Sequence, residues 1–341
     1  MELPYIPPLD EKAKQLAAER QALLTKPAGA LGRLEALSIR LAGMTGDIQW
    51  LPEKRVVVVC AGDHGITAQG VSAYPQEVTR QMVLNFLRGG AAVNVLARQM
   101  NARVTVVDTG VAGDLPDHHY LVKRKIAYGT RDFSHEPAMT PEQADQSLQI
   151  GLDVLHSELP LDILCVGEMG IGNTTVASAM IAVLTGQPVS LLTGRGTGVD
   201  DTALRHKIQV IEDALEYHHP TKDNVLQMVG GFEIGAMAGL MIGAASHRLP
   251  VVVDGVICTA AALLAVHLVP AVKGYLIASH CSVEPGHQIA LDALGLAPLM
   301  DLNLRLGEGT GAVLALPMIE AAMRTLQEMA TFHDAGVSGP A

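Results

Sequence analysis

A glutamate flanked by glycines is the residue of this sequence best suited to acid–base chemistry. Glu308 stands in the segment 305–311, Arg-Leu-Gly-Glu-Gly-Thr-Gly. Glycine neighbours let a flat substrate approach the carboxylate, and partial burial would raise the pKa of Glu308 toward a value useful to a general base. A surface glutamate in a glycine-rich turn is the alternative. Glu168 has a similar setting, and two carboxylates beside a ribosyl centre would stabilise an oxocarbenium-like transition state.

A glycine-rich segment at residues 167–175, Gly-Glu-Met-Gly-Ile-Gly-Asn-Thr-Thr, is a candidate phosphate site. Asn173 or Thr174 can cap the apolar helix predicted to follow, and the free N–H groups and the dipole of that helix attract an anion. The segment is neither a Walker A loop, because no Lys-Ser/Thr follows, nor a G-x-G-x-x-G fingerprint. A tight capped turn without a ligand is the alternative.

A second glycine-rich loop occupies residues 193–199, Thr-Gly-Arg-Gly-Thr-Gly-Val. It carries Arg195, and Lys207 follows one to two helical turns later. A nucleotide with one phosphate would fit between this loop and the segment 167–175. Taken alone, the second loop is the weaker signal of the two.

Histidines and carboxylates near predicted strand ends raise the question of a metal site. They are His64, His280 and His287, with Asp63, Asp254 and Glu284. None has the H-E-x-x-H arrangement or another compact ligand spacing. We therefore interpret them as polar residues satisfied within loops, and no metal is predicted.

Five short apolar, β-branched runs recur along the chain, at residues 55–60, 104–108, 163–166, 250–254 and 275–278. Continuous runs of this kind are typical of strands buried on both faces of a parallel sheet. Clusters of glycines, carboxylates and hydroxyls follow most of them. Because the ligand crevice of an open α/β sheet lies at the carboxyl ends of its strands, these clusters predict one large polar site.

Stretches with helical periodicity separate these runs, at residues 76–99, 141–156, 201–218, 233–247 and 310–329. The alternation predicts a doubly wound α/β fold. The first fifty residues break it, because residues 11–24 and 34–44 read as two helices with no strand between them. We expect an α/β core domain at residues 50–310 that carries the active site, and a small helical lobe made of residues 1–49 and 311–341.

Glycines recur every four residues in one of these helical stretches, at Gly231, Gly235, Gly239 and Gly243. In a helix they form one smooth face that permits close packing. Packing within the core and contact with a second subunit are the two interpretations.

Composition excludes several classes of protein. The net charge is −11, so the molecule repels phosphate backbones and anionic lipid, and no nucleic-acid partner is expected. The uncharged stretch 255–272 approaches the length of a membrane span, but it contains His267 and Pro270. A buried strand and helix are the favoured interpretation, and no membrane span is expected.

Two further features favour a cytoplasmic protein. The four cysteines, Cys60, Cys165, Cys258 and Cys281, are scattered, and three lie in apolar runs, which is typical of buried free thiols in a reducing compartment. The first residues lack the basic and apolar regions of a secretory signal, so no export is expected.

The ordered set of motifs resembles the nicotinate-nucleotide–dimethylbenzimidazole phosphoribosyltransferase family over almost the whole chain. Single motifs are weak, but the ordered set is specific. The matching segments are 26–35, where Ala30 stands in place of the usual Ser, then 61–65, 70–79, 167–175, 253–255, 279–284 and 305–312.

The resemblance implies a metal-free transfer of the phosphoribosyl group of nicotinate mononucleotide to 5,6-dimethylbenzimidazole, in the nucleotide-loop branch of cobalamin biosynthesis. It also implies a Rossmann-like sheet with a smaller helical lobe, a homodimer and no cofactor. Glu308 matches the family's general base, and Glu168 matches a second active-site carboxylate. The matched substrate-binding residues are Ser72, Tyr74, Met169, Gly170, Gly172, Asn173, Thr174, Gly194, Gly196, Lys207, Ser282, Arg305, Leu306 and Gly307.

Two alternatives stay open at this point. One is a paralogous transferase that uses another azole, a purine or a phenol, since the sequence does not size the acceptor pocket. The other is a nucleotide-binding module without catalysis, although a mere binder needs neither Glu308 nor Glu168. No role is assigned to Ala30.

Overall fold

The computed structural model describes residues 1–196, 198 and 200–338. Six parallel strands form the central sheet in the order β3-β2-β1-β4-β5-β6. The strands are β1 (Arg55–Gly62), β2 (Ala102–Gly110), β3 (Leu121–Lys123), β4 (Ile163–Met169), β5 (Val251–Val253) and β6 (Leu276–Ala278). The α/β fold and all five predicted strands are confirmed, and the order reverses between β1 and β4, where open sheets of this kind bind ligands.

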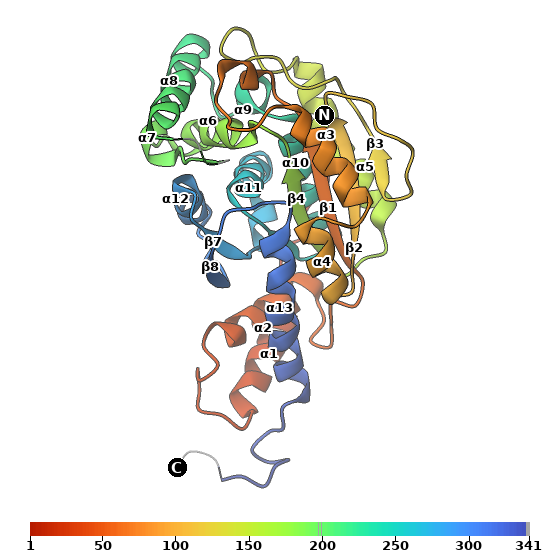
Figure 1. The fold of residues 1–341 in the computed structure, drawn as a ribbon. Helices are drawn as coiled ribbons and strands as arrows, with labels where there is room; N and C mark the ends of the chain where they lie inside the picture. The colour runs from red at the N-terminus through yellow and green to blue at the C-terminus, as the bar shows by residue number, and fades with distance from the viewer. Residues whose placement is uncertain (197, 199, 339–341) are drawn as a thin grey trace.

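Thirteen α-helices and two short 3-10 helices accompany the sheet in the described residues. They are α1 (Glu11–Leu23), α2 (Arg33–Thr45), η1 (Gly65–Gln69), α3 (Glu77–Leu87), α4 (Ala92–Gln99), α5 (Pro141–Glu158), α6 (Asn173–Thr185), α7 (Val189–Leu192), α8 (Asp201–His218), α9 (Val225–Val229), α10 (Phe232–Ser246), α11 (Val256–Leu268), η2 (Pro270–Tyr275), α12 (Pro285–Leu294) and α13 (Thr310–Glu328). In Figure 1, α3, α4 and α13 lie in front of the sheet, and α10 and α5 lie behind it.

The single helix predicted at residues 76–99 is wrong, because the structure divides it into α3 and α4. The two helices are separated at residues 88–91, where Gly89 adopts a left-handed φ of 75°. Glycine reaches this conformation without steric cost, and it ends α3. The second helix begins beside Glu308, whose carboxyl group accepts the N–H of Val93.

The sequence analysis also missed a second, two-stranded parallel sheet formed by β7 (His280–Ser282) and β8 (Met300–Leu304). β7 has only three residues, which is too short for a periodic signal, and the three central residues of β8 are all exposed, so β8 has no buried apolar run. This small sheet places the segment before α13 beside the main sheet.

The glycine face of α10 packs within the chain, so core packing is confirmed and the subunit-contact interpretation is wrong for this face. A Cβ at Gly239 would lie 2.0 Å from the carbonyl oxygen of Leu148 on α5, and one at Gly151 would lie 2.0 Å from the carbonyl oxygen of Ala236 on α10. Only glycine permits two helix backbones to approach this closely. All of α10 except its last residue is buried.

The apolar stretch at 255–272 forms the buried helix α11 and the 3-10 turn η2. In the described part of the chain, no helix combines the length and apolarity that crossing a membrane requires. Cys60, Cys165 and Cys258 are buried free thiols, as predicted, and Cys281 is partly exposed.

A long terminal helix, α13, connects the sheet to the N-terminal helices. Its start packs on β4 and β5, and it also packs on α1 and α2, which lie away from the sheet in Figure 1. The boundaries at residues 50 and 310 stay a prediction, since α13 runs through both parts without interruption.

Candidate active site

A cavity of about 510 Å³ opens beside the carboxyl end of β4, where the strand order reverses. It brings together most of the residues proposed from sequence, which come from segments up to 234 positions apart in the chain, Tyr74 and Glu308 being the outermost. Those that line it are Tyr74, Glu168, Met169, Gly170, Asn173, Thr174, Gly196, Ser282, Arg305, Leu306, Gly307 and Glu308.

Four of the proposed residues do not line the cavity: Ser72, Gly172, Gly194 and Lys207. The hydroxyl of Ser72 accepts a hydrogen bond from the Tyr74 N–H at 3.2 Å, so Ser72 shapes the loop that presents Tyr74. Gly172 caps α6 with φ of 94°. Lys207 is 1% exposed and lies behind Thr174. Of the second glycine-rich loop, Thr197 and Val199 lie outside the described residues.

Glu308 occupies the centre of an unusual turn, residues 307–309, which we call the Glu308 turn. The φ angles of Gly307, Glu308 and Gly309 are 87°, 65° and 88°. A non-glycine residue at positive φ is uncommon, because its Cβ crowds the following carbonyl, at a cost of about 1 kcal/mol. The carboxylate of Asp254, at the end of β5, holds the turn by accepting the N–H of Gly309 at 2.9 Å and the N–H of Ala312 at 3.0 Å.

The carboxyl group of Glu308 is buried but not saturated with hydrogen bonds. Burial raises its pKa above the ordinary carboxyl value, and the N–H of Val93, at the start of α4, donates to it and limits that rise. Among the described residues, Oε2 of Glu308 is buried and has no hydrogen-bond partner. A buried carboxylate with a raised pKa and an unpartnered oxygen, on a residue that lines the cavity, is suited to accept a proton from a bound substrate.

Glu168 lies directly at the end of β4 and touches the Glu308 turn. A Cβ at Gly307 would lie 2.3 Å from Oε1 of Glu168, and the charge of Glu308 contributes to the raised pKa of Glu168. Burial, together with the nearby carboxylates of Asp254 and Glu233, raises the pKa of Glu168 to about 8, although the hydrogen bond from the Asn173 amide lowers it. Glu168 therefore holds a proton through most of the neutral range in the empty cavity.

Another part of the cavity lining has the features of an anion site. It contains the start of α6, where Thr174 accepts a hydrogen bond from Nζ of Lys207 at 2.8 Å. Gly196 lies against the same hydroxyl, since a Cβ there would be 2.6 Å from Oγ1 of Thr174. Burial lowers the pKa of Lys207 to about 8, so its ammonium group is still mostly charged at neutral pH. A helix N-terminus, a hydroxyl and a buried ammonium group together suit a phosphate.

Apolar side chains line the cavity beside Tyr74 and Leu306, which are about half exposed. Val78 and Met82, one turn apart on α3, and Ile257 on α11 were missed from sequence, because apolar residues at helical spacing are normally read as core. Glu284 was also missed as a lining residue; it accepts the N–H of Gly196 at 3.1 Å. Such contacts between distant loops leave no local pattern.

The histidines are engaged within the protein. Nε2 of His64 lies 3.1 Å from a carboxylate oxygen of Glu233, and both side chains are fully buried. His287 accepts the Ser282 N–H at 2.9 Å, and burial lowers its pKa to about 3. Burial also lowers the pKa of His280, which lines the cavity, to about 4. Over the ranges that the structure describes, no three or more His, Cys, Asp or Glu residues are grouped to hold a metal ion.

Comparison with known proteins gives one consistent result. A family model described as phosphoribosyltransferase matches residues 6–337. A nicotinate-nucleotide–dimethylbenzimidazole phosphoribosyltransferase of Chloroflexus aggregans is 57% identical over 339 residues, 98% of this chain and 96% of the relative. One of Geobacter sulfurreducens is 53% identical over 95% of this chain and 94% of its own. A crystal structure of the Thermus thermophilus enzyme of that name is 47% identical, with a TM-score of 0.93 over 97% of this chain and 100% of that chain.

Proposed function

The chain belongs to the nicotinate-nucleotide–dimethylbenzimidazole phosphoribosyltransferase family, and we propose that it transfers the phosphoribosyl group of nicotinate mononucleotide to 5,6-dimethylbenzimidazole. The products are α-ribazole 5′-phosphate and nicotinate, which places the reaction in the assembly of the cobalamin nucleotide loop. The observation that carries the proposal is the buried, unpartnered oxygen of Glu308 at the cavity, among the residues that the structure describes.

The acceptor requires a base. One ring nitrogen of the benzimidazole attacks the anomeric carbon, and the other ring nitrogen loses its proton to Glu308. The bond between the anomeric carbon and the pyridinium nitrogen breaks, and its electron pair stays on nicotinate, which is a neutral-ring leaving group that needs no acid. Glu308 thus supplies the one proton transfer that the reaction requires.

Glu168 has a different role in this proposal. The donor brings a cationic pyridinium ring and develops positive charge at the ribosyl carbon. That positive charge favours the ionised form of Glu168 and lowers its pKa from about 8, so the carboxylate forms where it is electrostatically useful.

The remaining residues hold the two substrates. We assign the donor phosphate to the start of α6 with Gly170, Asn173, Thr174, Gly196 and, through Thr174, Lys207. Tyr74, Met169 and Leu306 supply the walls for the flat acceptor. Positioning of both partners in one cavity is the larger part of catalysis in such a transfer.

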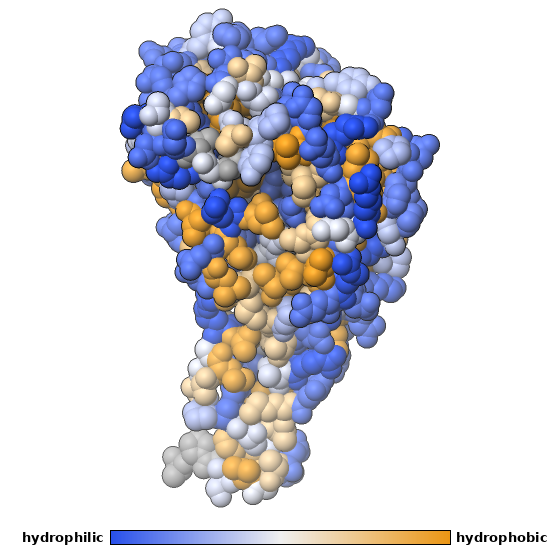
Figure 2. Space-filling view, in the orientation of Figure 1, coloured by the Kyte–Doolittle hydropathy of each residue, from blue (hydrophilic) through white to orange (hydrophobic). Residues whose placement is uncertain are grey.

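We also propose a cytoplasmic homodimer with the domain division given above. Apolar residues gather across the waist of the molecule, over α4, α13 and the β7–β8 pair (Figure 2). Val95, Leu302 and Leu306 are each more than half exposed there. Exposed apolar patches mark interaction sites, and a second copy of the chain is the partner that would cover this one.

Incubation with nicotinate mononucleotide and 5,6-dimethylbenzimidazole, without added metal, tests the reaction. Nicotinate and α-ribazole phosphate are followed by chromatography with mass detection. We expect equal amounts of both products. Donor binding without product would overturn the acceptor assignment and call for a panel of azoles, purines and phenols, and absence of donor binding would overturn the transferase assignment itself.

A further inference from the structure

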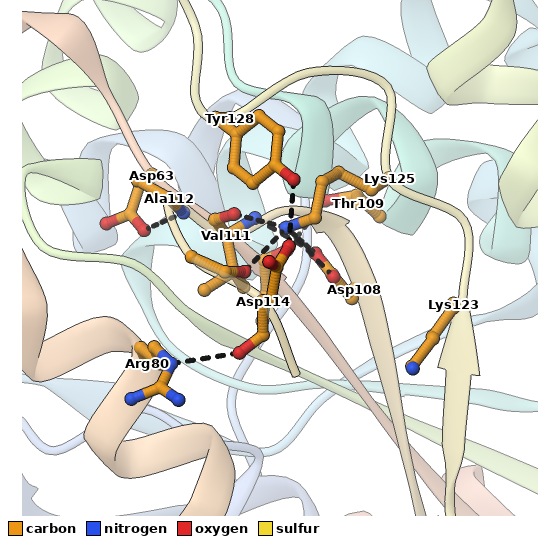
Figure 3. Close-up of polar contacts among 12 residues, drawn as sticks. Asp63, Arg80, Asp108, Thr109, Val111, Ala112, Asp114, Lys123, Lys125 and Tyr128 are labelled. Atoms are coloured by element: carbon orange, nitrogen blue, oxygen red, sulfur yellow. Dashed lines mark hydrogen bonds and ion pairs between the residues drawn. The ribbon is translucent and has the colours of Figure 1, made fainter. Parts of the chain in front are cut away.

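Lys125, two residues after β3, reaches a cage of oxygen atoms formed by the end of β2 and the loop that follows it (Figure 3). Its Nζ lies 3.3 and 3.1 Å from the two carboxylate oxygens of Asp108 and donates to the carbonyl of Gly113 at 3.1 Å. It also donates to the carbonyl of Val111, and it lies 4.8 Å from the ring centroid of Tyr128. We call these groups, the Asp108 carboxylate, the Val111 and Gly113 carbonyls and the Tyr128 ring, the Lys125 cage.

The cage has the composition of a cation site. A carboxylate, main-chain carbonyls and an aromatic face are groups that bind hard cations and N–H-bearing ammonium groups in proteins, and tetramethylammonium has no N–H to donate to these oxygens. Asp108 is 2% exposed, and its Oδ1 also accepts the N–H of Val111 at 2.9 Å. Without a cation beside it, this buried charge would lose its ion-pair partner. Lys123, only two residues earlier, pairs instead with the exposed Asp117 at 2.6 Å and lies apart from the cage in Figure 3.

The loop that forms the cage is connected to the candidate active site. Ala112, between the two carbonyl groups of the cage, donates its N–H to Oδ2 of Asp63 at 2.7 Å. Asp63 is 1% exposed and accepts a hydrogen bond from the hydroxyl of Thr79. The same hydroxyl accepts the N–H of Ile171 at 3.0 Å, and Ile171 lines the cavity in the glycine-rich segment before α6.

A second contact supports the same connection. Arg80, next to Thr79 on α3, donates from Nε to the carbonyl of Asp114 at 3.0 Å (Figure 3). The side chain of Asp114 accepts the hydroxyl of Tyr128 at 2.8 Å. The start of α3 is therefore connected to residues 111–114 by two sets of hydrogen bonds, so a movement of these residues would displace Thr79.

We propose that the ammonium group of Lys125 is a built-in cation that fills a monovalent-cation site. It holds residues 111–114 against Asp63, and through Thr79 it keeps Ile171 in the conformation that binds the donor. Because the cation is tethered, the native enzyme does not depend on dissolved K⁺ or ammonium for this loop. Lys125 is thus a positioning residue. Its effect on donor binding rests on the proposed function, whereas the filling of the cage by its ammonium group does not.

Three variants test the proposal. Lys125→Ala removes the tethered cation and leaves the cage open, Lys125→Met removes the charge but keeps an unbranched side chain in the way, and Lys123→Ala removes a neighbouring exposed charge. Each is measured in KCl, NH4Cl, methylammonium chloride and tetramethylammonium chloride at one ionic strength. The readouts are the melting temperature and the KM for nicotinate mononucleotide.

We expect Lys125→Ala in tetramethylammonium chloride to melt several degrees lower than the native protein and to show a KM for the donor about 10-fold higher, with a smaller change in kcat. K⁺, ammonium or methylammonium should restore both, because a ligand that binds only the folded state raises its stability. Lys125→Met should show the same drop in melting temperature and the same rise in KM, and none of the four salts should restore either value. Lys123→Ala should match the native protein in every salt.

Other outcomes overturn the proposal. No loss in Lys125→Ala, or a loss that every salt repairs equally, would mean that the cage binds no cation. Insolubility of Lys125→Ala in all four salts would count the same way, because an open cation site should let the variant fold in KCl. If the native enzyme shows no transfer, the proposed function fails, and the melting temperatures still decide whether Lys125 fills a cation site.

Discussion

The two carboxylates of the cavity are held in opposite ways. Glu168 ends a central strand of the sheet, and its position follows from the register of β4 with β1. Glu308 belongs to no regular element and sits in a turn with three successive positive φ angles, fixed by the carboxylate of Asp254. The sheet fixes the first carboxylate, and one buried side chain fixes the second.

The difference separates their chemistry. Glu168 is surrounded by other carboxylates and by the Asn173 amide, so its protonation responds to any cation that enters the cavity. Glu308 receives the Val93 N–H and, within the described part of the chain, keeps one oxygen free. We therefore expect Glu168 to respond to the donor and Glu308 to act on the acceptor, and the substitutions below test this separation.

The largest effect is expected from Glu308→Gln. The glutamine amide cannot take the proton of the benzimidazole, so kcat should fall by roughly 10²–10⁴, with a modest change in the KM for the donor. Steady-state kinetics with both substrates varied measures the two parameters separately. Glu212→Gln, an exposed glutamate on α8, is the control and should behave as the native enzyme. Near-normal turnover by Glu308→Gln would remove Glu308 from the role of base.

A smaller, pH-dependent effect is expected from Glu168→Gln. In the free enzyme the pKa of Glu168 is about 8, so its carboxylate is scarce below pH 8 and its fraction grows as the pH rises. The kcat/KM for the donor should rise through this range in the native enzyme and lose that rise in Glu168→Gln. The variant should be down about 10-fold at pH 7 and about 10²-fold at pH 9. A rise that persists in the variant would assign the titration to another group.

The sheet was predictable because its signal is local. Five runs of β-branched and apolar residues are long enough to mark strands buried on both faces, and each lies within a strand of the sheet or overlaps it. Short elements with polar residues, β3, β7 and β8, carry too little local pattern. The single helix predicted at 76–99 was wrong at Gly89 and Gly90. The apolar periodicity of the sequence continues through these residues, although the left-handed backbone at Gly89 ends the helix.

The candidate site was predictable only where a carboxylate lies next to glycines shortly after a strand, as at Glu168 and Glu308. The hydrogen bonds that hold the Glu308 turn could not be predicted. Asp254 accepts them from the main-chain N–H groups of Gly309 and Ala312, and almost every residue type has such a donor, so the sequence does not mark it. The hydrogen bond from the Val93 N–H to Glu308 could not be predicted for the same reason. Family resemblance named Lys207, and only the structure shows that its ammonium group donates to Thr174 from outside the cavity lining.

Asp254→Asn tests the support of the Glu308 turn, and it also lowers the pKa of Glu168, because the Asp254 carboxylate is one of the charges that raise it. The amide keeps one acceptor oxygen, so one of the two N–H groups of Gly309 and Ala312 loses its partner in a buried position, at about 1–3 kcal/mol. We expect kcat to fall about 10-fold and the melting temperature to drop by several degrees. The rise of kcat/KM for the donor with pH should remain, with its midpoint moved to lower pH. Unchanged kcat in a destabilised protein would mean that the turn holds itself.

Asn173→Ala is the matched test on the other side, and its effect should be the smallest. The amide of Asn173 donates to Oε2 of Glu168 and lowers the pKa of that carboxyl group. Without this bond the pKa of Glu168 rises further, so less carboxylate is present at pH 7, and kcat/KM for the donor should fall several-fold there. Raising the pH ionises Glu168 again, so the loss should shrink toward pH 9 while the midpoint of the curve lies above that of the native enzyme. A loss of equal size at every pH would show that Asn173 acts only through the donor phosphate site and not through Glu168, and the response of Glu168 to its surroundings would then have to be sought in Asp254 and Glu233 alone.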